Sequence, residues 1–147
     1  MYSTTAAPPF PLRRDALTGV RTRRVLALAF DLAVVSVLAA VLWTVLLVLT
    51  LGLSWFFVPP LFPLVAFFYN GLTVSGARMG TWGMRAMDLE LRMHESGSRV
   101  PFINAAAHAL FFYLSWFFPP VFLVSLVDAE KRFLHDILAG VVATRRL

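Results

Sequence analysis

The sequence predicts an all-α membrane protein with about three transmembrane segments and a small cytoplasmic loop that holds a short β pair. Two observations favour this class. The 147-residue chain is 59% hydrophobic, with a mean hydropathy of +0.76, whereas soluble domains are usually about half apolar or less. Its apolar residues also lie in long runs flanked by cations, which is typical of membrane spans.

The charge balance fits the same interpretation. Thirteen Lys and Arg against eight Asp and Glu give a net charge of +5. Because the cations flank apolar runs, membrane topology explains them and no nucleic-acid partner is expected. The sequence contains no cysteine, which excludes disulfides, thiolate metal sites and a cysteine nucleophile. It also lacks a recognisable phosphate-binding motif, so no cofactor is expected.

The N-terminal region is predicted to be a flexible basic tail over residues 1–22, followed by one transmembrane domain over 23–147. The tail is rich in proline and arginine. The apolar run behind it is too long for the hydrophobic part of a cleaved signal peptide. We therefore expect an uncleaved anchor with a cytoplasmic N-terminus.

Two spans are predicted in the first half. Residues 25–50 are almost wholly apolar and long enough to cross a bilayer core of about 30 Å. A second span is expected over 55–72. It contains Pro59, Pro60 and Pro63, and proline removes a backbone donor and clashes with the preceding turn. A kink or break is therefore expected near 58–63.

The polar stretch 73–100 is predicted to be cytoplasmic because it carries four arginines between apolar runs. Within it, residues 87–94 alternate between apolar and polar side chains, which is the period of a β-strand. Residues 141–144 could form its partner after Gly140. Such a pair requires a cytoplasmic C-terminal tail.

The third apolar stretch, 102–127, leaves two topologies open. As a single tilted span it would place the C-terminal tail outside. As a re-entrant hairpin bent at Pro119 and Pro120 it would keep the tail inside. The cations of the tail and the expected strand pair favour the re-entrant hairpin.

Asp31 is the most informative residue, because a carboxylate inside a spanning helix costs at least about 2.5–3.5 kcal/mol. Arg24 and Asp31 lie on one helix face, since a spacing of seven stacks on a helix. Side chains lean toward the helix N-terminus, so a direct contact between them is strained and a partner from another segment is expected. Asp31 is either a proton or cation site or a fixed structural anchor.

Histidine supplies the remaining candidates. His108 belongs to a polar stripe on an apolar helix that should face the protein interior; it would form a proton-sensitive pair if it met Asp31, or else be a hydrogen-bonded core histidine. His135 and Asp136 lack the spacing of a metalloprotease helix, so no metal is expected. Asp136 could bond Arg85 or Arg132.

Three short motifs resemble the RDD family of bacterial membrane proteins. They are residues 23–31 (RRVLALAFD), 80–87 (GTWGMRAM) and 134–140 (LHDILAG). The resemblance implies that Arg24, Asp31 and Asp136 are the residues for which the family is named, and that the chain lies in a bacterial inner membrane. It also implies transport, proposed for the family and including cation/proton antiport for some members. Many members carry arginine where His108 stands here.

Two functions remain open. The first is a small oligomeric transporter, for a cation with protons or for an unknown ligand, that uses Asp31. The second is a non-enzymatic scaffold or accessory subunit in which Arg24, Asp31, Arg85 and Asp136 form an ion-pair network. Both have the lipid bilayer as partner, with a second copy or another membrane subunit. No enzyme is expected, because no nucleophile–base pair or cofactor motif is recognisable.

Overall fold

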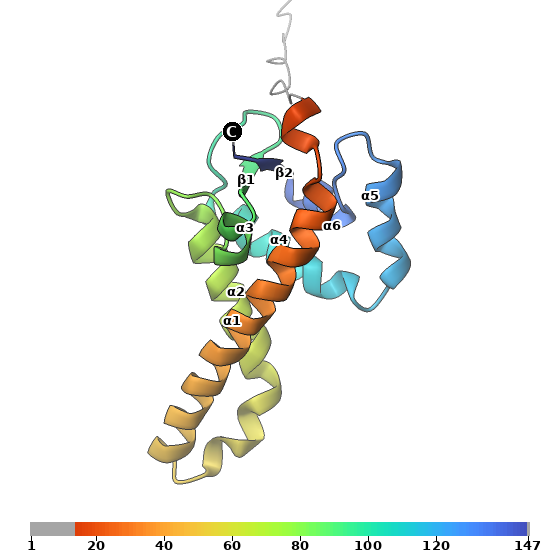
Figure 1. Cartoon of the computed structure of the whole chain (residues 1–147). Helices are drawn as coiled ribbons and strands as arrows, with labels where there is room; N and C mark the ends of the chain where they lie inside the picture. Colours follow the sequence, from red (N-terminus) through yellow and green to blue (C-terminus); the bar gives the residue numbers. More distant parts are fainter. Residues whose placement is uncertain (1–13, 147) are drawn as a thin grey trace, which may run out of the picture.

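The computed structural model describes residues 14–146 and is mostly helical with one small sheet, which confirms the predicted helical class and the β pair. Figure 1 shows a long hairpin of two helices with the other elements gathered at one end. In chain order the elements are η1 (Arg14–Leu17), α1 (Val20–Leu49), η2 (Leu53–Phe57), α2 (Val58–Ser75), α3 (Trp82–Ala86), β1 (Leu89–Met93), α4 (Phe102–Ser115), η3 (Pro119–Leu123), α5 (Val124–Val127), α6 (Leu134–Ala139) and β2 (Val141–Arg145).

α1 is 30 residues long, about 45 Å at 1.5 Å per residue. Among the described helices it is the one long and apolar enough to cross a membrane by length and composition. It begins at Val20 after Gly19, which has a φ of 68°, so it starts five residues earlier than expected. Ala16 and Leu17, within the predicted tail, are buried. Residues 1–13 of that tail lie outside the described residues.

α2 returns beside α1 to complete the hairpin (Figure 1). The break expected near 58–63 is the junction between η2 and α2 at Val58. Two prolines lie in the first turn of α2, where a missing backbone N–H costs little. Pro63 follows inside the helix. Val35, Ala66 and Tyr69 form a small buried cluster between the two helices.

The sheet joins two segments far apart in sequence. β1 and β2 pair antiparallel, from Leu89 opposite Arg145 to Met93 opposite Val141. The main core of buried residues packs around this sheet and draws on the start of α1, α4 and α6. The sheet therefore joins the chain segments that precede and follow residues 102–127.

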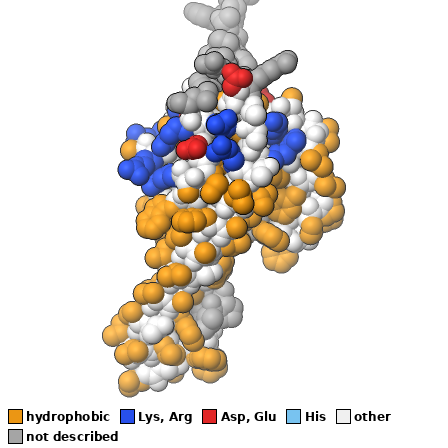
Figure 2. Space-filling model, in the orientation of Figure 1, with side chains coloured by type: hydrophobic (Ala, Val, Ile, Leu, Met, Phe, Trp, Pro, Cys, Tyr) orange, Lys and Arg blue, Asp and Glu red, His pale blue; other side chains and the backbone are white. Residues whose placement is uncertain are grey.

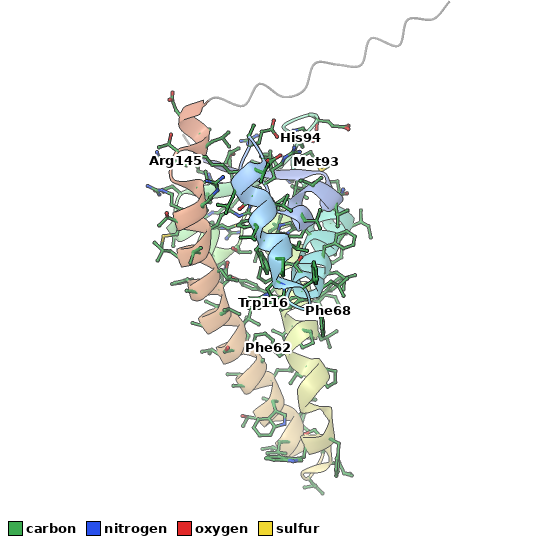
Figure 3. All side chains as sticks on the ribbon, turned by 90° about the vertical axis from the view of Figure 1, so that its right-hand side faces the viewer. Phe62, Phe68, Met93, His94, Trp116 and Arg145 are labelled. Atoms are coloured by element: carbon green, nitrogen blue, oxygen red, sulfur yellow. The ribbon has the colours of Figure 1, made fainter. Side chains whose placement is uncertain are left out.

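The 102–127 segment is a hairpin. The chain turns at 116–118, just before the two prolines that open η3, and comes back through α5. Figure 3 shows Trp116 at this turn, part of the way along α1. Met93 and His94 lie at the end of the molecule that holds β1 and β2, which we call the sheet end. The chain thus runs away from the sheet through α4 and returns toward it through α5.

The surface separates charge from apolar side chains. Figure 2 shows lysine and arginine side chains around the sheet end and hydrophobic side chains over the α1–α2 hairpin. Along α1, large apolar side chains such as Val37, Val41 and Val48 are exposed. This distribution is compatible with a membrane protein.

Candidate functional site

Asp136 is fully buried at the N-terminal turn of α6. Its carboxylate accepts a hydrogen bond from the backbone N–H of Phe133, at 2.8 Å from Oδ2. This bond from the third helical position back to the N-cap residue fixes the direction of the carboxylate. Gly140, with a φ of 67°, ends the helix in the left-handed conformation and starts β2. The local sequence therefore holds Asp136 pointing into the protein.

Arg24 of α1 makes a bidentate ion pair with this carboxylate. Its Nη1 bonds Asp136 Oδ2, and its Nη2 lies 2.7 Å from Oδ1. The guanidinium also lies over the ring of Phe133, 4.5 Å from the ring centre, and only 8% of the side chain is exposed. A planar guanidinium suits both the paired oxygens and the ring. The pair ties α1 to α6 across 112 positions.

Two histidines complete the cluster. His108 of α4 lies with its Nε2 2.8 Å from Asp136 Oδ1. The Nε2 of His135 is 3.5 Å from Asp136 Oδ1 and 3.5 Å from Arg24 Nη2. The two imidazole rings are 4.9 Å apart. Asp136 thus contacts side chains from three helices, α1, α4 and α6.

The charges in this cluster are fixed by its surroundings. Burial opposes ionisation of Asp136, but the Arg24 guanidinium and the hydrogen bond from His108 hold the pKa of this carboxyl well below its usual range. Burial lowers the pKa of His135 to about 3, against the opposing charge of Asp136, so its imidazole is neutral. The carboxylate is therefore an anion matched by one guanidinium.

His108, His135 and Asp136 also bring their ligand atoms within 4.8 Å of one another, which is close enough for a metal ion. The donor set does not suit one, however. Both carboxylate oxygens of Asp136 already accept from Arg24. A divalent cation would have to displace the guanidinium and lie beside its positive charge. The arrangement is that of an ion pair with histidine neighbours.

Asp31 forms a second, separate site two turns further along α1. Its Oδ1 accepts from the hydroxyl of Tyr69 at 2.6 Å and from the backbone N–H of Gly83 at 2.8 Å. Its Oδ2 accepts from the hydroxyl of Thr81 at 2.5 Å. As expected, these partners come from other segments, namely α2 and the start of α3.

The partners of Asp31 are themselves held in place. The Tyr69 oxygen accepts from the backbone N–H of Trp82 at 3.0 Å. Thr81 is the N-cap of α3, and its hydroxyl accepts from the backbone N–H of Met84. A Cβ on Gly83 would lie 2.2 Å from the Ala27 carbonyl oxygen and 2.8 Å from Asp31 Cγ. Only glycine allows α3 to approach α1 this closely.

His108 is a buried, hydrogen-bonded histidine that contacts Asp136 and not Asp31, in agreement with the second of its two alternatives. Two other expectations about this site are wrong. Asp136 bonds Arg24 instead of Arg85 or Arg132, and Asp31 forms no ion pair within the described residues. The four-residue ion-pair network therefore reduces to one pair.

Arg85 is outside that network because it finds another acceptor. Its Nη2 lies 3.2 Å from the Thr73 carbonyl oxygen near the C-terminal end of α2, where unpaired carbonyls attract cations. Burial and the neighbouring charge of Arg78 lower the pKa of Arg85. Arg132 pairs with Asp128 and Glu130.

Sequence reasoning missed the three donors around Asp31. Thr81 and Gly83 carried a signal, because a threonine two residues before a glycine in the 80–87 motif fits an N-cap followed by a close backbone approach. Tyr69 gave no such signal in the sequence, because it lies in an apolar run where a tyrosine is common. Its hydroxyl gains meaning only once α2 lies beside α1.

Comparison with known proteins agrees with the three motifs. The model of the RDD family matches residues 18–140, most of the chain. Neither the curated proteins nor the solved structures include a match. The matched region contains both carboxylate sites described above, and we conclude that this chain belongs to the RDD family.

Proposed function

We propose that this chain is a non-enzymatic, multi-pass protein of the bacterial inner membrane that acts as a scaffold or accessory subunit. One observation carries the proposal: Asp136 is fully buried and bound by Arg24 and His108. A buried carboxylate with an ionic partner joins chain segments firmly, because removing either partner leaves an uncompensated charge. The site is built to hold helices together.

The topology that supports this function has both termini in the cytoplasm. α1 crosses the membrane, and η2 with α2 returns. The 102–127 hairpin enters from the sheet end and goes back to it. The cations at the sheet end support this orientation, since cytoplasmic segments are enriched in lysine and arginine (Figure 2).

The bonding of the two carboxylates argues for a structural role over a proton-carrying one. Asp136 is held as an anion by Arg24 and His108. Asp31 accepts three hydrogen bonds from α2 and the start of α3, which hold its carboxylate in one position between the helices. A proton carrier needs a group that changes charge during its cycle. The fixed anion at Asp136 is not arranged for that.

The apolar flanks of α1 give a scaffold its contact surface. Large hydrophobic side chains are exposed along the whole helix, including Leu26, Val37 and Leu49. Lipid tails cover such side chains, and so does another transmembrane helix. The partners in this proposal are the lipid bilayer and either a second copy or another membrane subunit.

The test compares stability with transport in the Asp31→Asn protein. A structural role predicts a lower unfolding temperature in detergent and no cation-driven proton flux by the wild type in proteoliposomes. Glu95→Gln, on an exposed turn, is the control and should change neither. An Asp31→Asn protein that unfolds at the wild-type temperature would refute a structural role for this residue.

A small oligomeric transporter is the second candidate, and one observation favours it. Asp31 lines a pocket of about 360 Å³ between α1 and the 102–127 hairpin. Three segments do not enclose a pathway alone, so this candidate needs an oligomer. Flux under a Na⁺, K⁺ or pH gradient that the wild type shows and a folded Asp31→Asn protein lacks would favour transport over the scaffold.

A further inference from the structure

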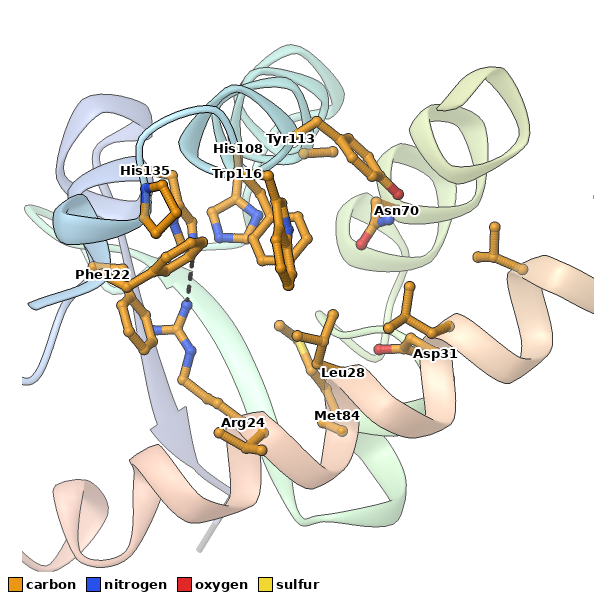
Figure 4. A pocket seen from close by; sticks show the side chains of 18 residues that line it. Arg24, Leu28, Asp31, Asn70, Met84, His108, Tyr113, Trp116, Phe122 and His135 are labelled. Carbon is orange, nitrogen blue, oxygen red and sulfur yellow. Dashed lines mark hydrogen bonds between the residues drawn. The ribbon is translucent and has the colours of Figure 1, made fainter. Parts of the chain in front are cut away.

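The pocket exists because α1 and the 102–127 hairpin pack on different neighbours. α1 packs mainly on α2 and α3, whereas α4 packs on α2 and α6. The space left between them has a volume of about 360 Å³. Figure 4 shows Arg24 and His135 at one end of it and Asp31, Asn70 and Tyr113 at the other. We propose that this pocket binds a lipophilic amine, with its ammonium group at Asp31.

Asp31 places a carboxylate in the pocket wall that forms no ion pair within the described residues. Its carboxylate lines the pocket and is bound by neutral donors only: two hydroxyls and one backbone N–H. No arginine, lysine or histidine of residues 14–146 forms an ion pair with it. A carboxylate has about four acceptor positions, so one remains for a ligand. Arg85 acts on Asp31 only at a distance, because its guanidinium is bound to the Thr73 carbonyl oxygen. A carboxylate that forms no ion pair in an apolar wall attracts a cation.

Two further polar groups lie beside Asp31 in the pocket wall, from Asn70 and Tyr113. The amide nitrogen of Asn70 donates to the Ala66 carbonyl oxygen at 2.8 Å. Its amide oxygen is therefore the group left for a ligand, and it points into the cavity (Figure 4). The hydroxyl of Tyr113 lies at the same end. An ammonium group has three N–H donors and no acceptor, which suits a carboxylate, an amide oxygen and a hydroxyl.

The remaining walls of the pocket are mostly apolar and aromatic, and include Leu28 on α1 and Phe112, Trp116 and Phe122 of the hairpin. Aromatic faces also favour a nearby cation. Arg24 and Asp31 are seven residues apart on α1, or about 10 Å. An apolar body about as long as an eight-carbon chain therefore fits between the two ends.

An anionic amphiphile fits less well, because the charge of Arg24 is already engaged. Both Nη atoms bond Asp136, and the guanidinium plane lies over Phe133. A carboxylate or phosphate group at this end would have to break a buried ion pair. Its negative charge would also share the cavity with Asp31.

The test is equilibrium dialysis of radiolabelled n-octylamine against the full chain in a neutral detergent at pH 7, with empty micelles as the blank. n-Octanol and octanoate serve as neutral and anionic probes of the same length. We expect saturable binding of the amine at one site per chain and binding at least about tenfold weaker for the other two, since a charged hydrogen bond is lost. The experiment measures no flux, so its result is independent of whether the protein is a scaffold or a transporter.

Three variants locate the site. Asp31→Asn is expected to weaken amine binding at least about tenfold, and Asn70→Leu several-fold. Leu28→Trp, which fills the cavity without touching the acceptors, should abolish binding. The last two keep the test valid if Asp31→Asn does not fold. Equal binding of amine and octanol, preference for octanoate, or amine binding that survives Leu28→Trp would each overturn the proposal.

Discussion

The two aspartates of this protein are held in opposite ways. Asp136 is fully buried and faces a guanidinium. Asp31 is partly exposed at a pocket wall and faces two hydroxyls and a backbone N–H. The comparison shows that depth of burial decides the partner: a carboxylate removed completely from solvent needs a counter-charge, while fixed dipoles suffice at a partly open wall. The first arrangement joins helices, and the second leaves negative charge available.

The largest loss of unfolding free energy is expected for Asp136→Asn. It leaves the Arg24 guanidinium buried without its ionic partner, which should cost about 3–5 kcal/mol of unfolding free energy. Denaturation in detergent, followed by circular dichroism, measures it. The matched control is Asp88→Asn, since Asp88 pairs with Arg23 but is 67% exposed; a loss of about 0–1 kcal/mol is expected there. Equal losses in the two variants would contradict the comparison.

A smaller loss of unfolding free energy is expected for Asp31→Asn. The amide keeps the shape and one acceptor oxygen, but it turns an –NH₂ group toward one of the donors. About 1–3 kcal/mol should be lost, the cost of an unsatisfied polar contact. The same denaturation measurement applies. A loss as large as that of Asp136→Asn would show that Asp31 also depends on an ionic partner.

The third prediction concerns pH. The pKa of His135 is about 3 in the folded protein and about 6.5 in an unfolded chain. Below pH 6.5 the unfolded chain therefore binds more protons, and stability should fall by up to about 1.4 kcal/mol per pH unit. The unfolding temperature between pH 7 and 5 measures this loss. His135→Phe keeps an aromatic ring beside Phe133 and should make the unfolding temperature less dependent on pH. If the pH dependence is unchanged in this variant, another group causes it.

The smallest loss of unfolding free energy is expected for Tyr69→Phe. It removes a hydroxyl that donates to Asp31 and accepts from the Trp82 backbone N–H. About 0.5–1.5 kcal/mol should be lost. Tyr113→Phe is the matched control, because no hydrogen bond of its hydroxyl is described, and its stability should stay near the wild type. If both variants lose the same amount, the bonds of Tyr69 do not stabilise the Asp31 site.

Much of the fold follows from local patterns in the sequence. The uninterrupted apolar run predicts α1, and strict alternation over 87–94 predicts β1. The arginines flanking the apolar runs favour a 102–127 segment that returns to its side of entry. These signals are local, so neighbouring residues suffice to read them.

The contacts of the site could be predicted only in part. Helical spacing shows that His108 faces inward, yet it does not say which helix that face meets. For this reason the sequence leaves two alternatives for His108 open, and only the structure shows that it contacts Asp136. The pairing of Arg24 with Asp136 depends on how α6, which carries Asp136, packs against α4 and α1. Arg85 was misassigned because a backbone carbonyl at a helix end competes with carboxylates for its guanidinium.

The separation of 112 positions between Arg24 and Asp136 has a consequence for biosynthesis. At about 5–20 residues per second, ribosomes complete the partner roughly 6–22 s after Arg24. During that interval Asp136 is not there to pair with the arginine, and in the proposed topology the long side chain can extend to the lipid headgroups. β2 emerges later still, so the sheet closes last. A nascent chain that stops before residue 136 therefore lacks the carboxylate that pairs with Arg24 in the finished protein.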